Sequence, residues 1–121
     1  MSAILVVDDD RTGLDAVGAF LEADGFEVDR LTSGKRAVAV LRKKKYELIM
    51  LDHLMPEQDG VETMKLIRAM EEQSGTPIVA MSGNSDPDAR DFFVGEGFDD
   101  FVSKPITYDA LRTVTDKWIS K

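Results

Sequence analysis

The sequence predicts an α/β protein built on a doubly wound, five-stranded parallel sheet. Five short apolar runs alternate with five predicted helical stretches, most of which have apolar residues every three or four positions. No linker, repeat or low-complexity tract interrupts this alternation. Strands that alternate with helices are joined by right-handed crossovers, which place helices on both faces of one parallel sheet. We therefore expect residues 1–121 to form a single domain.

The strands are predicted from apolar runs, because central strands of a parallel sheet are covered on both faces. The predicted strands span residues 3–7, 26–31, 48–51, 78–81 and 100–103. The second has a weaker, alternating pattern, so we expect it at an edge of the sheet.

The helices are predicted mainly from apolar residues at helical spacing, but the fourth, which is rich in acids and contains a glycine, is expected to be the least stable. They cover residues 12–23, 33–44, 61–70, 87–96 and 107–120. Ser33 and Asp59 are the expected N-caps of the second and third helices. Gly25 and Gly97 follow the first and fourth, where glycine commonly ends a helix.

Composition excludes several classes of function. The net charge of -8 argues against nonspecific nucleic-acid binding, and the absence of cysteine excludes disulfides and thiol chemistry. We interpret the basic run at residues 42–45 as cations at the end of the second helix, in preference to a phosphate-binding patch. No apolar run approaches the roughly 20 residues of a membrane span, and no signal peptide precedes the first strand pattern. We expect a soluble, cytoplasmic protein.

Polar side chains follow four of the five predicted strands. The carboxyl ends of parallel strands share one edge of the sheet, where ligands bind in this fold class. The side chains expected to meet there are Asp8, Asp9, Asp52, Ser82 and Lys104.

This set suits phosphoryl transfer. Magnesium prefers oxygen ligands and is typically held by one or two carboxylates, and with Mg²⁺ the formal charge of the three acids and Lys104 sums to zero. A carboxylate can act as a nucleophile toward phosphoryl groups, and we assign this role to Asp52. Ser82 can donate a hydrogen bond and Lys104 can neutralise phosphoryl charge.

Simpler structural roles exist for several of these residues. Asp8, Asp9 or Asp10 could cap the first helix, and Asp52 or Ser82 could be a turn residue. Lys104 could be an ordinary surface lysine. The convergence of four loops on one edge favours the functional interpretation.

His53, the only histidine, neighbours Asp52. Successive strand residues point to opposite faces, so we expect His53 to face away from Asp52 and to have a packing role in preference to a pH-sensing one. One of Phe92 and Phe93 is expected in the core, and the other is a candidate partner contact.

Four segments resemble the receiver domain of two-component response regulators, in order and over essentially the whole chain. They are VVDDD at residues 6–10, LDHLMPEQDG at 51–60, MSG at 81–83 and DDFVSKPI at 99–106. The resemblance implies a flavodoxin-like, three-layer sandwich with strand order 2-1-3-4-5.

The resemblance also implies roles for individual residues. Asp52 would accept a phosphoryl group from a phosphohistidine of a sensor histidine kinase or histidine phosphotransfer protein. Asp9 would bind Mg²⁺ directly and Asp8 largely through water, with the Leu54 carbonyl as a third contact. The Lys104–Pro105 peptide bond is expected to be cis.

Ser82 and Phe101 occupy the positions of the family's switch residues. In such receivers they move on phosphorylation and remodel the face made by the fourth helix, fifth strand and fifth helix, which binds a downstream protein target. Phe101 lacks the hydroxyl that this aromatic often carries, so its role would depend on burial. Leu54 and Asn84 flank the site at positions that commonly vary in the family.

The implied function is that of a phosphorylation-switched signalling domain, not a conventional enzyme. It would catalyse its own Mg²⁺-dependent phosphorylation and dephosphorylation, as a monomer or weak homodimer without membrane or direct nucleic-acid contact. One alternative is a metal-dependent phosphohydrolase, against which Leu54 stands where a second acid is expected. A nucleotide-binding module is disfavoured because Gly34–Lys35 lacks the rest of a phosphate loop. A catalytically silent scaffold is the third alternative.

Overall fold

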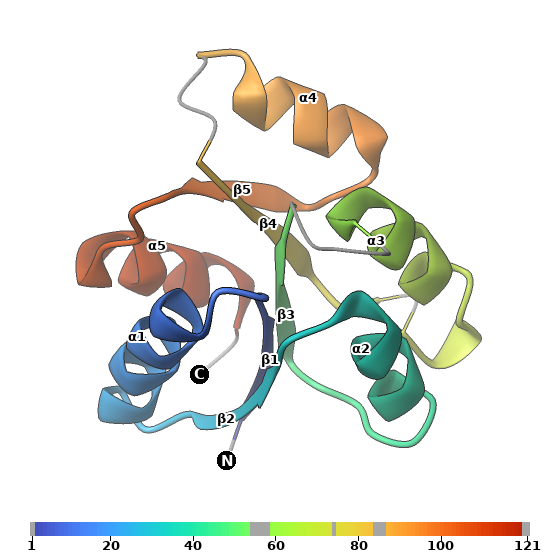
Figure 1. Cartoon of the computed structure of the whole chain (residues 1–121), viewed down its shortest axis with the longest axis horizontal. Coiled ribbons are helices and arrows are strands. Elements are labelled where there is room, and N and C mark those ends of the chain that lie inside the picture. The colour runs from blue at the N-terminus through green and yellow to red at the C-terminus, as the bar shows by residue number, and fades with distance from the viewer. Residues whose placement is uncertain (1, 54–58, 74, 84–86, 120–121) are drawn as a thin grey trace.

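The computed structural model describes residues 2–53, 59–73, 75–83 and 87–119. Strands and helices alternate along these residues (Figure 1). The strands are β1 (Ala3–Val7), β2 (Glu27–Leu31), β3 (Leu48–Asp52), β4 (Ile78–Ser82) and β5 (Asp100–Ser103). The helices are α1 (Arg11–Ala23), α2 (Gly34–Leu41), α3 (Gly60–Arg68), α4 (Ala89–Glu96) and α5 (Tyr108–Trp118). A short 3₁₀ turn, η1 (Glu71–Gln73), precedes β4 and was not predicted.

All four strand pairings are parallel, in the order β2-β1-β3-β4-β5. The predicted fold class and strand order are therefore confirmed. Every residue of β3 is buried, as an unbroken apolar run predicts for a central strand. The edge strand β2 is only partly covered, in agreement with its weaker pattern. Within the described ranges, no helix has the length and apolar character of a membrane span.

Helices cover both faces of the sheet, with α1 and α5 on one side and α2 and α3 on the other (Figure 1). Strand side chains alternate between the two cores. Leu5, Val7 and Leu51 pack with residues of α2, α3 and α4. Ile4 and Met50 pack with residues of α1 and α5. A residue's position in its strand therefore indicates the core toward which it points.

The predicted caps of α2 and α3 are present. The Ser33 hydroxyl accepts a hydrogen bond from the Arg36 amide, and the Asp59 carboxylate accepts one from the Glu62 amide. Such caps satisfy backbone donors that the first helical turn leaves without partners. Asp59 therefore fixes the start of α3, which follows the segment after Asp52.

Helix α2 ends at Leu41, three residues before the predicted end at Lys44. The buried amide of Gln73 donates hydrogen bonds to the carbonyls of Leu41 (3.0 Å) and Lys44 (3.1 Å), and thereby holds this segment in a turn. The basic run at residues 42–45 therefore lies at and beyond the end of the helix. Its interpretation as a set of cations at the end of the second helix agrees with this position, with Arg42 as the C-cap.

Candidate functional site

The ends of β1 and β3 place two aspartates side by side. Val7 of β1 pairs with Leu51 of β3 in the parallel register. The next residues, Asp8 and Asp52, therefore lie side by side at the carboxyl ends of the two strands. Both residues alternate toward the face covered by α1 and α5. Asp8 is 1% exposed and Asp52 is 4% exposed, which is rare for carboxylates without partners.

Lys104 supplies the partner for both carboxylates. Its ammonium nitrogen lies 2.9 Å from Asp8 Oδ2 and 2.9 Å from Asp52 Oδ1. The Lys104 backbone is anchored by its amide, which donates to the Ser82 carbonyl at 2.8 Å. The following peptide bond to Pro105 is cis, as predicted. The cation therefore directly follows β5 and bridges Asp8, which follows β1, and Asp52, which ends β3.

Electrostatics at the site favour a further cation. The pKa of Asp52 is raised to about 6, chiefly by burial and also by the charge of Asp8, against the opposing effect of the hydrogen bond from Lys104. Burial also lowers the pKa of Lys104, but hydrogen bonds to Asp8 and Asp52 outweigh this and leave it above its usual value. One ammonium thus compensates two buried acids incompletely.

A third carboxylate completes an acidic cluster. Oxygen atoms of Asp8, Asp9 and Asp52 lie within 4.8 Å of one another, with Asp9 exposed. The Asp10 amide donates to Asp8 Oδ1 at 2.9 Å and so orients that carboxylate. Asp10 occupies the N-cap position of α1, but its side chain makes no capping hydrogen bond. The three oxygen donors fit a hard divalent cation such as Mg²⁺.

The predicted switch residues lie on the other face of the sheet. Phe101 packs against the core formed with α2, α3 and α4. Ser82, the buried last residue of β4, is two positions beyond Ala80 and therefore alternates toward that same core. His53 faces away from Asp52, as predicted, and its ring lies edge-on to Phe93 with centroids 4.8 Å apart. Leu54 and Asn84 lie outside the described residues.

Gly60 brings the start of α3 into contact with the end of β3. A β-carbon at this position would lie 2.4 Å from the Asp52 carbonyl oxygen and 2.9 Å from the His53 α-carbon. The Gly60 amide donates to the His53 carbonyl at 2.9 Å. Glycine is therefore needed here for close backbone approach, and it helps to fix the backbone at Asp52.

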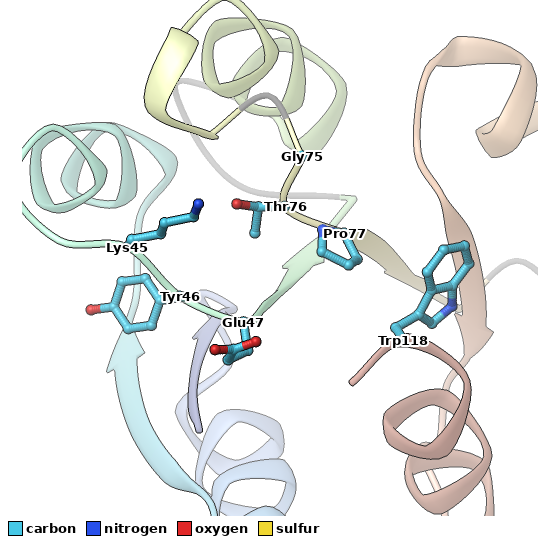
Figure 2. A pocket seen from close by; sticks show the side chains of 7 residues that line it. All are labelled: Lys45, Tyr46, Glu47, Gly75, Thr76, Pro77 and Trp118. Carbon is cyan, nitrogen blue, oxygen red and sulfur yellow. The ribbon is translucent and has the colours of Figure 1, made fainter. Parts of the chain in front are cut away.

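Two hollows lie at opposite ends of the strands of the sheet. One, of about 460 Å³, adjoins the acidic cluster and is lined by Asp8, Asp10, Thr12, Gly13, Ala16, Val17, Lys104, Pro105 and Ile106. The other, of about 480 Å³, lies where β3 and β4 begin (Figure 2) and is lined by Lys45, Tyr46, Glu47, Gly75, Thr76, Pro77 and Trp118. Only the first hollow opens onto Asp8 and Lys104.

Comparison with known proteins decides the family. Residues 4–116 match the model of the response regulator receiver domain. The chain belongs to this family. It is thus a receiver domain of two-component signalling, and the resemblance of its motifs is confirmed.

The relatives of this receiver include kinases and single receivers. It is 34% identical over 95% of its length to the sensor protein GacS of Pseudomonas syringae, of which it covers 13%. The receiver domain of a Pseudomonas aeruginosa sensor histidine kinase, solved with magnesium in its active-site cleft, superposes with a TM-score of 0.90 at 28% identity, with 99% and 98% of the two chains covered. The chemotaxis regulator CheY4 of Vibrio cholerae gives 0.91 at 25% identity, with 98% and 99% covered.

The receiver spans only 11% to 20% of the length of eight curated relatives. The activities of those longer proteins therefore do not transfer to it directly.

Two features of this receiver were not predicted from its sequence. Asp100 is buried and binds Arg90 of α4 together with Lys117 and Trp118 of α5, so it links three elements. Phe93, and not Phe92, is the buried member of the aromatic pair, with exposures of 1% and 52%. Asp100 is the second acid of the DDFVSKPI segment, and the two phenylalanines are adjacent in the sequence. Neither feature indicates which residues these side chains contact in the fold.

Proposed function

We propose that this receiver is switched by phosphorylation of Asp52. The donor is a phosphohistidine of a sensor histidine kinase or a histidine phosphotransfer protein. One carboxylate oxygen of Asp52 attacks phosphorus, an O–P bond forms, and the P–N bond to the donor imidazole breaks. Water later attacks the phosphorus of the acyl phosphate, the O–P bond to Asp52 breaks, and inorganic phosphate leaves the restored carboxylate.

The observation that carries this proposal is the bridge from Lys104 to Asp8 and Asp52 beside the acidic cluster. A nucleophilic carboxylate and a cation at hydrogen-bond distance are the parts that phosphoryl transfer requires. Lys104 can pair with the Asp52 carboxylate before the transfer and with the negative charge of the phosphoryl group after it. Ser82, at the end of the next strand, is assigned the hydrogen bond to a phosphoryl oxygen.

We assign Mg²⁺ to Asp8, Asp9 and Asp52, with the Leu54 carbonyl as a further ligand. The donor chemistry supports this, because all three side chains offer oxygen ligands within 4.8 Å. When bound, the ion neutralises charge on the phosphoryl oxygens. The magnesium in the cleft of the related kinase receiver supports the same assignment.

The hollow between α1 and Lys104 supports a site for the phosphodonor. It is mainly apolar, opens onto Asp8, and includes Ala16 and Ile106. Relatives that are sensor kinases support a histidine phosphodonor as the partner. The output surface is assigned to α4, β5 and α5, where Phe101 responds to the state of Asp52 and a downstream protein binds.

Phosphoryl incorporation tests the proposal. The protein is incubated with a small acyl phosphate, with Mg²⁺ or with a chelator, as wild type and as Asp52→Asn. We expect Mg²⁺-dependent incorporation of one phosphoryl group per chain in the wild type and none in the variant. Asp10→Asn is the matched control, since Asp10 lies next to the cluster but outside it, and should label like the wild type. Equal labelling of Asp52→Asn would remove Asp52 from its assigned role.

A further inference from the structure

Phe93 is the centre of an aromatic cluster next to the site. Its side chain is buried in the core between the sheet and α4. Four rings have their centroids within 5.7 Å of its own, and they belong to His53, Phe92, Phe98 and Phe101. Among the described residues, the ring of Phe93 is the one that contacts all four.

Two of these contacts join the phosphoacceptor strand to the output face. His53 directly follows Asp52, and its ring meets Phe93 edge-on at 4.8 Å. Phe101 of β5 lies flat against the same ring, with centroids 5.3 Å apart and planes only 10° apart. The ring of Phe93 therefore contacts both the residue that follows Asp52 and Phe101.

Close packing couples the movements of Phe93 and Phe101. Protein interiors have few voids, so Phe101 cannot turn inward unless the ring stacked on it also moves. A shift of the β3 end likewise moves the ring of His53, which packs on Phe93. Since Phe101 has no hydroxyl, it cannot be drawn inward by a hydrogen bond from its ring, and packing alone must transmit the change.

We propose that Phe93 is a positioning residue that couples the state of Asp52 to the orientation of Phe101. The inference rests on the proposed function and deepens it, because it names the contact through which phosphorylation reaches the output face. The coupling passes from β3 through His53 to Phe93 and from there to Phe101. Aromatic pairs of this geometry correspond to about two- to tenfold in an equilibrium constant.

Phe98 provides a matched control. It is 2% exposed and contacts the ring of Phe93 edge-on at 5.7 Å, so its loss perturbs the same core. Within the part of the chain that the structure describes, no ring contact joins Phe98 to His53 or Phe101. A general packing defect would therefore affect Phe93→Leu and Phe98→Leu alike, whereas coupling depends on Phe93.

A double-mutant cycle tests the coupling. The probe is beryllofluoride with Mg²⁺, and its dissociation constant is measured for wild type, Phe93→Leu, Phe101→Leu and the double variant. We expect Phe101→Leu to change the affinity by about two- to tenfold when Phe93 is present and to change it little when Phe93 is leucine. The amide resonances of Phe101 and Val102 should respond to the probe in Phe98→Leu but not in Phe93→Leu. Phe93→Met, which keeps most of the volume, serves the same cycle if Phe93→Leu does not fold.

The outcomes separate this inference from the proposed function. Additive effects of the two substitutions, in proteins that still bind the probe, would overturn the coupling and leave the phosphoacceptor in place. An unchanged response of the Phe101 amide in Phe93→Leu would do the same. If the wild type binds no beryllofluoride and accepts no phosphoryl group, the proposed function fails and the coupling fails with it.

Discussion

The ammonium of Lys104 lies 2.9 Å from a carboxylate oxygen of Asp52, and it is equally close to Asp8. One cation at the end of β5 thus holds together two buried acids at the ends of β1 and β3. These three residues are far apart in the chain and meet because the parallel strands end at one edge of the sheet. The arrangement concentrates negative charge where an incoming divalent cation would be attracted.

Loss of the Lys104 cation should destabilise the protein. In Lys104→Met the two buried carboxylates face each other without compensation, so the free energy of unfolding should fall by about 1–3 kcal/mol at about pH 7.5 without divalent cations. Urea denaturation measures this. Lys65→Met, which removes an exposed ion pair with Glu96, should change stability by less than about 0.5 kcal/mol. Equal effects of the two substitutions would contradict the bridging role.

Asp52→Asn should stabilise the protein without Mg²⁺ at neutral pH. Burial raises the pKa of Asp52 from 3.8 to about 6, so the folded state binds this proton more tightly than the unfolded state does. Ionised Asp52 therefore costs stability above about pH 6, and the cost disappears as the pH falls toward 3.8. Asparagine avoids the cost, by about 1–3 kcal/mol near pH 7.5.

Unfolding curves of wild type and Asp52→Asn over this pH range check the prediction. The difference should shrink as the solution is acidified, and Mg²⁺ should reduce it at neutral pH by stabilising the wild type. An advantage of asparagine that grew toward low pH would have the wrong sign and would argue against burial as the cause of the shift.

Neighbouring aspartates should differ in their effect on magnesium affinity. Asp9 belongs to the acidic cluster, whereas Asp10 uses its backbone to orient Asp8. Asp9→Asn should weaken Mg²⁺ binding by at least about tenfold, in the range seen when metal-site residues are replaced, and Asp10→Asn by much less. Calorimetric or fluorescence titration with Mg²⁺ measures both. The reverse order would place the ion elsewhere.

A methyl group at Gly60 should disturb the site from the backbone. Because the added β-carbon would lie 2.4 Å from the Asp52 carbonyl oxygen, α3 or the end of β3 must shift, at a cost of about 1–3 kcal/mol. Gly60→Ala should also lower the rate of phosphoryl incorporation. Gly95→Ala in α4 is the control, since nothing lies within 4 Å of its added carbon and alanine favours helix by about 1 kcal/mol. Thermal denaturation of both variants distinguishes them.

The sequence predicted the elements of this fold well because each carries its own local signal. Unbroken apolar runs identified β1 and β3, and the caps Ser33 and Asp59 marked the starts of α2 and α3. The end of α2 had no such signal. It depends on Gln73, a residue more than thirty positions after Leu41. The side-chain amide of Gln73 donates hydrogen bonds to the carbonyls of Leu41 and Lys44.

The same distinction applies to the site. Asp8, Asp52 and Lys104 could be brought together from sequence because strand ends converge in a parallel sheet. The choice between Phe92 and Phe93 could not be made, since α4 has acids and a glycine on several sides and no clear apolar stripe. The stacking of Phe93 on Phe101 follows from tertiary packing alone.

The most direct test of the account identifies the residue that carries the phosphoryl group. The wild-type protein is phosphorylated by a small acyl phosphate with Mg²⁺, the acyl phosphate is trapped by borohydride reduction, and peptides are mapped by mass spectrometry. We predict a single reduced position, Asp52. Reduction at Asp8 or Asp9 with Asp52 intact, or at no aspartate, would contradict the central claim.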